Sequence, residues 1–320
     1  MFELALQNLL SPMVLFFLLG CGLTAVRSDL SIPGAVAKLL VLYLMMSIGF
    51  RGGAEVAHQG LSSKLLLSIV AGLLLSFLTP FVAFALLRLT TGLDRVNAAS
   101  VAAHYGSISA VTFVTGLSAL AQLGIPYEGF MVAVAAVMET PAIISGLALG
   151  RRDALANGRQ ELLREILLNG AVVMLLGSFA IGIFTGDRGM TMLQPFLIQM
   201  FPGFLCLFLL DMGLVAGRGL RDGWRSLSPQ VVVFAVVMPL IGATAAALMA
   251  PLVGLSVGGT AVLIILAASA SYIAVPAAMQ LALPQANPAI PLTLSLGVTF
   301  PFNLVVGIPV YIAVAQRMAG

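Results

Sequence analysis

Two long apolar segments of this chain are each interrupted by small, hydroxyl-bearing residues. The interruptions are Gly-Ser-Ile-Ser at 106–109 and Ala-Ser-Ala-Ser at 268–271, about 160 residues apart in a chain of 320 residues. Each is followed about 30 residues later by a second interruption, at 139–141 and at 299–303. Matching interruptions in two halves of a membrane protein are typical of secondary transporters, which bind their substrates at such breaks near the middle of the membrane.

The composition places the chain in a lipid bilayer. Hydrophobic residues make up 60% of it and charged residues 8%, whereas about 25% of the residues in a soluble protein are charged. No Asp, Glu, Lys or Arg occurs between residues 226 and 316, a stretch that allows several crossings at about 20 residues each. We expect an all-α membrane protein without a soluble domain, and we attribute the net charge of +3 to its loops rather than to nucleic-acid binding.

Hydropathy predicts ten transmembrane helices, five in each half of the chain. We expect them at about 9–26, 34–50, 64–88, 95–122, 126–150, 165–185, 193–217, 228–253, 256–283 and 291–316. Residues 1–150 and 166–320 are the two expected halves, joined by a polar cytoplasmic linker at 151–165. Because five is an odd number, the second half enters from the opposite side, which predicts a 5+5 inverted repeat with two broken, crossing helices.

Two further patterns support this topology. The segments 48–53 and 212–217 echo each other, and we expect them at the ends of the second and seventh spans. With both termini outside, eleven of the 15 Lys and Arg residues lie in the inner loops, as the positive-inside rule requires. Cys21 and Cys206 lie in apolar runs and indicate neither a disulfide framework nor a metal site.

Broken helices expose partial charges at the break. A break leaves unpaired N–H groups where its second half begins, and these groups attract anions; the carbonyl end of the first half attracts cations. No Lys or Arg lies between residues 96 and 150 or between 226 and 316. An anion held between the fourth and ninth spans would therefore be neutralised by backbone N–H groups, serine hydroxyls and a co-bound cation. This predicts a small, hydrogen-bonding anion coupled to a cation.

Several polar residues near the breaks have both a functional and a structural interpretation. Glu139 lies near the middle of the fifth span, where a carboxylate indicates a functional site unless it only links helices. Hydroxyl and amide oxygens of the kind that sodium prefers come from Ser109, Thr112, Thr140 and Asn303, although Ser and Thr within a membrane often bond to their own helix. The same two interpretations apply to His104, which is either a proton relay or a packed residue, to Tyr272, and to Asp211.

The chain resembles the cyanobacterial sodium-dependent bicarbonate transporters and their wider bacterial family over nearly its whole length. The resemblance is carried by Ser-Ile-Gly-Phe-Arg-Gly-Gly at 47–53, by 106–117, by Met-Glu-Thr-Pro-Ala at 138–142, and by 267–316 with Pro-Gln-Ala-Asn-Pro at 284–288. It implies ten spans in an inverted repeat, a core domain that moves against a gate domain in an elevator-type cycle, and a homotrimer. It also implies a multi-pass protein of the bacterial inner membrane.

The resemblance also implies a set of binding residues. Bicarbonate would contact the two breaks, at Gly106, Ser107, Ile108, Ser109, Ser271 and Tyr272. Sodium, the coupling ion, would lie beside it. The combined expectation for sodium is Ser109, Thr112, Glu139, Thr140, Ser269, Ser271 and Asn303. We expect no other metal and no cofactor.

The sequence departs from the cyanobacterial pattern in ways that bear on coupling. That pattern has an aspartate where this chain has Tyr272 and another where it has Glu139, which leaves the number of sodium ions open. The cyanobacterial proteins also carry a long inner loop and a PII-like regulatory partner, whereas the linker here is about fifteen residues long. The short linker disfavours such a partner.

The leading hypothesis is sodium-coupled import of bicarbonate or a similarly small anion. One alternative is a sodium- or proton-coupled carrier of a small carboxylate, which Tyr272 and His104 would favour. Another is a membrane sensor that binds the anion without transporting it, which the short inner loops disfavour. An enzyme is not expected, because the sequence contains no nucleotide-binding loop, metal-spaced cluster or nucleophile–base pair.

Overall fold

The computed structural model describes residues 10–59, 62–150, 170–223, 228–272, 275–276, 278–279 and 283–319. These residues form helices and no strand. In the first half the helices are α2 (Pro12–Ala25), α3 (Gly34–Gln59), α4 (Ser63–Thr90), α5 (Arg95–Gly106), α6 (Ala110–Gln122), α7 (Met131–Val137) and α8 (Glu139–Gly150). The predicted linker at 151–165 lies outside the described residues.

The described residues of the second half form α-helices and three π-helical turns, labelled η. Its elements are α11 (Gly170–Gln194), η1 (Pro195–Gln199), α12 (Phe201–Gly223), α13 (Pro229–Val253), α14 (Val257–Ala267), α16 (Ala289–Leu294), η3 (Ser295–Thr299), α17 (Phe300–Phe302), η4 (Asn303–Gly307) and α18 (Ile308–Ala319). Within α11 the chain turns sharply at Gly186, whose φ of 50° and ψ of −141° are non-helical. This turn comes where the sixth span was expected to end.

Short polar residues begin several of these helices. The side chains of Ser62, Asp94 and Ser256 accept hydrogen bonds from backbone N–H groups in the first turns of α4, α5 and α14. Ser11 caps α2 in the same way and is followed by Pro12 at the first helical position. Such caps satisfy N–H groups that have no partner within the helix. Local sequence therefore sets where the spans begin.

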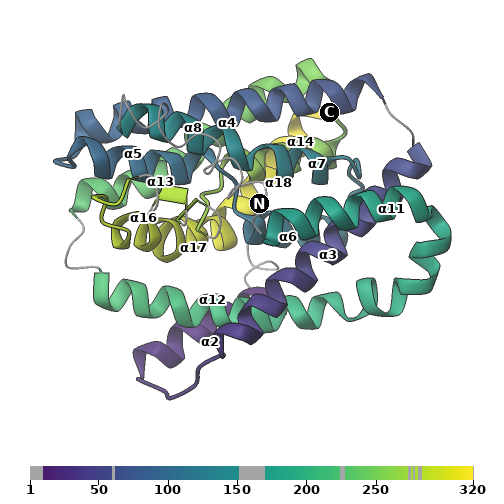
Figure 1. Cartoon of the computed structure of the whole chain (residues 1–320), viewed down its shortest axis with the longest axis horizontal. Helices are drawn as coiled ribbons and strands as arrows, with labels where there is room; N and C mark the ends of the chain where they lie inside the picture. The colour runs from purple at the N-terminus through teal and green to yellow at the C-terminus, as the bar shows by residue number, and fades with distance from the viewer. Residues whose placement is uncertain are drawn as a thin grey trace.

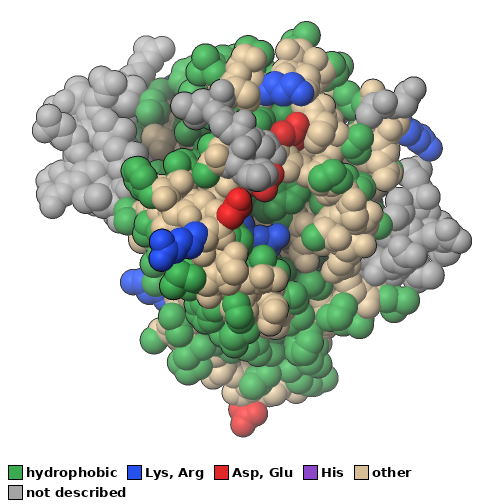
Figure 2. Space-filling model, turned by 90° about the vertical axis from the view of Figure 1, so that its right-hand side faces the viewer, with side chains coloured by type: hydrophobic (Ala, Val, Ile, Leu, Met, Phe, Trp, Pro, Cys, Tyr) green, Lys and Arg blue, Asp and Glu red, His purple; other side chains and the backbone are tan. Residues whose placement is uncertain are grey.

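Six helical segments among the described residues are long and apolar enough to cross a membrane, and two shorter apolar helices accompany them. Large hydrophobic side chains are exposed on α4, and Figure 2 shows hydrophobic side chains over much of one face. The expectation of an all-helical, multi-pass membrane protein is thus confirmed. The count of ten spans stays a prediction, since the fourth and ninth are divided and the sixth begins outside the described residues.

The sequence predicted that segment 48–53 lies at the end of the second span. The structure shows that the helix continues beyond it. Helix α3 continues to Gln59 and packs along α11 (Figure 1). A Cβ atom on Gly53 would lie 1.9 Å from the Phe179 carbonyl oxygen, and one on Gly182 would lie 2.2 Å from that of Phe50. The glycines therefore allow two helix backbones to approach closely, as small residues do within membranes.

The matching echo at 212–217 has the same role. Helix α12 crosses α2, and Figure 1 shows the two side by side. A Cβ on Gly213 would lie 2.1 Å from the Phe17 carbonyl oxygen, and one on Gly20 would lie 2.3 Å from that of Leu210. The glycines of both echoes thus lie where two helix backbones approach closely.

The remaining helices form a second group, in the upper part of Figure 1. Helix α4 packs on α5 and α8, α5 packs on α8, α13 packs on α14 and α4, and α14 packs on α18. The interruptions expected at 139–141 and 299–303 are distortions rather than full breaks. Helix α8 follows α7 after Met138 alone, and residues 289–319 stay helical through η3 and η4. Wide π turns absorb the disturbance that a proline such as Pro301 causes.

Candidate functional site

The first break lies between α5 and α6 and consists of Ser107, Ile108 and Ser109. Ser107 and Ser109 have extended backbone angles. The Ser109 hydroxyl accepts the N–H of Thr112 at 3.1 Å and so caps α6. The first-turn N–H groups of Ala110 and Val111 have no partner within their own helix. The predicted break is confirmed, and the positive end of α6 faces into it.

The second break follows α14. Non-helical backbone runs through Ser269, Ala270 and Ser271. The Ser269 hydroxyl donates to the Leu266 carbonyl oxygen at 2.7 Å. Residues 273 and 274 lie outside the described residues, and helical backbone is described again at Val275 and Pro276. The second predicted break is therefore present as well.

The two breaks meet inside the protein. The backbone N–H of Ser109 donates to the Ser269 hydroxyl at 2.8 Å, and the backbone N–H of Ser271 donates to the His104 carbonyl oxygen at 2.7 Å. The side chains of these four residues are all at most 2% exposed. We call this meeting point, formed by residues 107–109 and 269–272, the crossing.

Ser109 and Ser271, which the resemblance places in contact with an anion, use their backbone N–H groups across the crossing. Each N–H group is bonded to the opposite break. An unpaired N–H group in an apolar interior is costly. Closing the breaks on one another satisfies both groups. Among the described residues, the N–H groups of Ala110 and Val111 make no such bond.

Glu139 lies next to the first break. Its side chain is 8% exposed, and its Oε2 accepts the Ser107 hydroxyl at 3.0 Å. Ser76 of α4 fixes the junction that carries Glu139: its hydroxyl donates to the Met138 carbonyl oxygen at 2.6 Å and accepts the Ala142 N–H at 3.2 Å. The fifth span therefore places its carboxylate against the first break. Ser76 was not predicted.

Asn303 reaches the second break from η4. Its Nδ2 donates to the Ala268 carbonyl oxygen at 2.7 Å, and its Oδ1 accepts the Tyr311 hydroxyl at 2.9 Å. A second buried link joins the halves nearby, where the Tyr105 hydroxyl lies 2.6 Å from that of Thr299. The sequence singled out Asn303 but gave no role to Tyr311, because only the fold brings its hydroxyl to the amide.

Tyr272 follows the second break. Its hydroxyl is buried and has no hydrogen-bond partner among the described residues, and the Ser109 side chain is near it. The Tyr272 ring packs edge-on against Phe300 at a centroid distance of 5.9 Å, and Phe300 packs in turn against Phe17 of α2 at 5.1 Å. The Tyr272 hydroxyl, which has no hydrogen-bond partner among the described residues, thus lies beside the N-terminus of α6, and the rings of Phe300 and Phe17 pack in a row behind the Tyr272 ring.

The other predicted residues are less directly engaged. Gly106 is closely packed, since a Cβ there would meet Pro80 at 2.4 Å. Ile108 belongs to the apolar core, and Thr112 is buried and joined to Ser109 through its backbone. Thr140 is half-buried on the first turn of α8. Among the described residues, none of these side chains makes a hydrogen bond from one break to the other.

His104 and Asp211 differ in their surroundings. His104 is 1% exposed and its Nδ1 lies 2.7 Å from the Ser100 carbonyl oxygen, so the packed interpretation holds for one ring nitrogen. Asp211 is buried on α12, close enough to Arg218 for electrostatic attraction. Helix α12 belongs to the other helix group, and Asp211 is not part of the crossing.

Two broken helices that join buried hydroxyl and carboxyl groups inside an apolar bundle define a membrane transporter of the broken-helix class. The chain belongs to the Na⁺-dependent bicarbonate transporter superfamily, whose family model matches residues 12–316. This membership confirms the resemblance seen in the sequence and places the chain among transporters rather than enzymes. A search of the curated proteins gives no match.

Proposed function

We propose that the protein is a secondary active transporter that imports bicarbonate, or a similarly small anion, together with sodium. The observation that carries the proposal is the crossing: two breaks meet among hydroxyl groups and one carboxylate, in spans that contain no Lys or Arg after Arg95 at the start of α5. A small anion needs only a few N–H and O–H donors, whereas the charge of a bare anion needs a cation nearby. Family membership supports the same pair of ions.

The anion would be held at the N-terminus of α6. The N–H groups of Ala110 and Val111 have no intrahelical partner, and the Tyr272 hydroxyl beside them has none among the described residues. A slight separation of the breaks would also release the N–H groups of Ser109 and Ser271. Backbone N–H groups at a helix N-terminus stabilise an anion through both hydrogen bonding and the helix dipole.

Sodium would lie between the crossing and the fifth span. Glu139 supplies the one carboxylate there, and the hydroxyls of Ser107 and Ser269 lie on the two breaks. Asn303 holds the Ala268 carbonyl at the edge of the same region, and Thr112 and Thr140 complete the proposed oxygen ligands. Sodium bound here would offset the charge of the anion and couple the two movements.

We further propose that the chain is a ten-span inverted repeat. The reciprocal pairing of helices supports this, because α2 of the first half packs on α12 of the second and α11 of the second packs on α3 of the first. The ends of the broken spans are tied reciprocally too. Glu128 accepts the N–H of Ser256 at 2.7 Å where α14 begins, and Asn97 of α5 accepts the N–H of Asn287 at 2.8 Å.

The two helix groups suit an elevator-type cycle. Helices α2, α3, α11 and α12 would form the gate, and the remaining helices, which carry the crossing, would form the moving core. The Phe17–Phe300 contact joins the two groups. A homotrimer in the bacterial inner membrane, with both termini outside, stays part of the proposal and is supported by family membership and the distribution of Lys and Arg.

The energetics of coupling are adequate. One net charge that moves through 100 mV yields about 2.3 kcal/mol, which corresponds to an accumulation of about 50-fold. An electroneutral cycle of one sodium ion with one bicarbonate ion would draw on the sodium gradient alone. Comparing uptake at different membrane potentials would separate the two cycles.

Uptake of labelled bicarbonate into proteoliposomes, with and without an inward sodium gradient, tests the proposal. We expect uptake only with sodium and with the purified protein present. An absence of sodium-stimulated uptake would contradict it. Competition by small carboxylates in the same assay would favour the alternative substrate, and binding without flux would favour an anion sensor.

A further inference from the structure

The side chain of Asn303 is buried beside the end of α14, and both ends of its amide are bonded. Its Nδ2 donates to the Ala268 carbonyl oxygen at 2.7 Å, and its Oδ1 accepts the Tyr311 hydroxyl at 2.9 Å. Because a carbonyl oxygen can only accept a hydrogen bond, the amide nitrogen must be the atom that faces Ala268. Asn303 therefore presents a donor, rather than an oxygen ligand, to the second break.

The backbone around Asn303 makes room for the amide in this position. Asn303 begins the π-helical turn η4, and Gly307 ends it. A Cβ atom on Gly307 would lie 2.6 Å from Asn303 Oδ1 and 2.9 Å from Cε2 of the Tyr311 ring. Any side chain at position 307 would therefore collide with the bond between Asn303 and Tyr311. Since π turns within α-helices are frequent at functional sites, this fixed amide is a candidate for a function in transport.

The carbonyl end of α14 receives donors from the protein itself. The end of a broken half-helix carries a partial negative charge, and in transporters such ends coordinate the coupling cation. Here the Leu266 carbonyl oxygen accepts the Ser269 hydroxyl at 2.7 Å, and the Ala268 carbonyl oxygen accepts the Asn303 amide. No Asp or Glu occurs between residues 226 and 316. The Asn303 amide thus supplies the partial positive charge that a cation would supply at this end.

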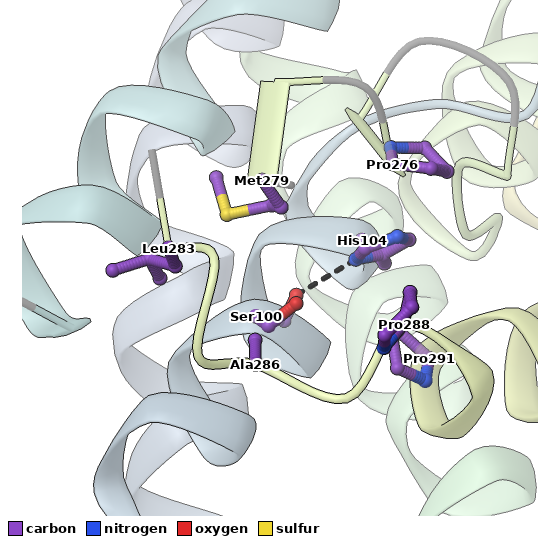
Figure 3. Close-up of a pocket in the computed structure, with 8 residues that line it drawn as sticks. All are labelled: Ser100, His104, Pro276, Met279, Leu283, Ala286, Pro288 and Pro291. Atoms are coloured by element: carbon purple, nitrogen blue, oxygen red, sulfur yellow. Dashed lines mark hydrogen bonds between the residues drawn. The ribbon is translucent and has the colours of Figure 1, made fainter. Parts of the chain in front are cut away.

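The first break differs, because a carboxylate lies against it. Glu139 Oε2 accepts the Ser107 hydroxyl at 3.0 Å. The imidazole of His104 is directed elsewhere: it lines a pocket beside Pro276, and its Nδ1 lies 2.7 Å from the Ser100 carbonyl oxygen (Figure 3). That oxygen can only accept, so Nδ1 donates along its own helix. One break therefore keeps an anionic ligand for a cation, whereas the other holds a neutral amide.

We propose that the Asn303 amide takes the place of a second sodium ion, so that the protein carries a single sodium ion with each anion. This inference rests on the proposed function, because it specifies how many cations the crossing binds. The transported cation binds at the first break beside Glu139, and the second break closes without one. With bicarbonate as the anion, the complete cycle moves no net charge across the membrane.

Simultaneous uptake of labelled sodium and labelled bicarbonate into proteoliposomes measures the ratio of the two ions. The wild-type protein should take up one sodium ion with each bicarbonate ion, and its sodium dependence should have a Hill coefficient of about one. A ratio of two sodium ions to one bicarbonate ion would overturn the inference and leave sodium-coupled transport intact. An absence of sodium-stimulated uptake would instead reject the proposed function.

Asn303→Asp tests the amide by adding a carboxylate at the second break. The new carboxylate would face the Ala268 carbonyl oxygen, and a buried charge needs a partner of opposite charge. At about pH 8 we expect this variant to bind a second sodium ion, which raises both the Hill coefficient and the ratio of sodium to bicarbonate toward two. Asn287→Asp is the matched control, because Asn287 is exposed and its Oδ1 accepts the Ala289 N–H, as a carboxylate oxygen also can.

Thermal unfolding in detergent measures cation binding without transport. Sodium should raise the unfolding temperature of Asn303→Asp more than that of the wild type, because a ligand that binds only the folded state stabilises it. Choline at the same ionic strength is the control cation. Equal effects of sodium on the two proteins, or transport by Asn303→Asp with a single sodium ion, would overturn the inference. If Asn303→Asp does not fold, the ratio of the two ions in the wild-type protein decides.

Discussion

The backbone N–H of Ser109 donates to the hydroxyl of Ser269 at 2.8 Å, across 160 positions of sequence. The two residues belong to the two breaks, one in each half of the chain. Their bond shows that the breaks are packed against one another rather than merely present in the same protein. An opening of the crossing to admit an anion must therefore break this contact.

Replacing Ser269 with Ala should destabilise the protein by about 1–3 kcal/mol, because it leaves the buried Ser109 N–H without an acceptor. Thermal unfolding in detergent measures the change. Ser295→Ala is the control, since the Ser295 hydroxyl is also buried but has no partner among the described residues. Equal losses of stability for the two variants would contradict a specific role for the Ser109–Ser269 bond.

Replacing Glu139 with Gln should raise the sodium concentration needed for half-maximal uptake about tenfold or more, because a hydrogen bond to a charged group is worth about 1.5–3 kcal/mol. Gln keeps an oxygen that can accept the Ser107 hydroxyl, so the fold should persist. Sodium dependence of bicarbonate uptake is the measurement. Glu128→Gln serves as the control, because Glu128 bonds to Ser256 away from the crossing. If the sodium dependence of uptake were unchanged in Glu139→Gln, the Glu139 carboxylate would not be part of the coupling site.

Replacing Tyr272 with Phe should weaken bicarbonate binding about 10- to 100-fold, given the worth of a hydrogen bond to a charged group. Stability should hardly change, since the hydroxyl has no partner among the described residues. Tyr105→Phe should behave in the opposite way, because the Tyr105 hydroxyl is bonded to Thr299. Anion-dependent thermal stabilisation of the two variants measures both effects, and wild-type affinity in Tyr272→Phe would refute the assignment.

Replacing Gly213 with Ala should destabilise the crossing of α2 and α12 by about 1–3 kcal/mol through overpacking. The added Cβ would lie 2.1 Å from the Phe17 carbonyl oxygen. Gly203→Ala on the same helix is the control, because a Cβ there meets nothing within 4 Å. Thermal unfolding of the two variants should differ clearly, and a harmless Gly213→Ala would mean that the helices can separate without cost.

Much of the site was predictable because its residues break a local pattern. Clusters of small and hydroxyl-bearing residues, as at 106–109 and 268–271, coincide with breaks, whereas a single serine such as Ser76 stays within a helix. Glu139 is conspicuous in a membrane span. The sequence analysis overestimated how strongly prolines interrupt the helices. The segments at 139–141 and 299–303 stay helical, because a bend or a π turn can accommodate Pro141 or Pro301 without a break.

The residues that sequence analysis missed have ordinary local surroundings. Ser76 lies on a long apolar helix and gains its role only by meeting the junction after Met138. The glycines at 49–53 and 213–217 were recognised as an echo but were expected at helix ends. Their function depends on α11 and α2, which pack against them and are distant in sequence.

The sequence by itself determined the membrane class, the two broken spans and the residue types at the breaks, because hydropathy and helix interruption are local properties. The tertiary structure alone decided that the breaks bond to each other, that Glu139 reaches Ser107, and that the His104 carbonyl oxygen accepts the Ser271 N–H. Those relations join residues that lie between 32 and 167 positions apart. They depend on how rigid helices pack, which no short stretch of sequence encodes.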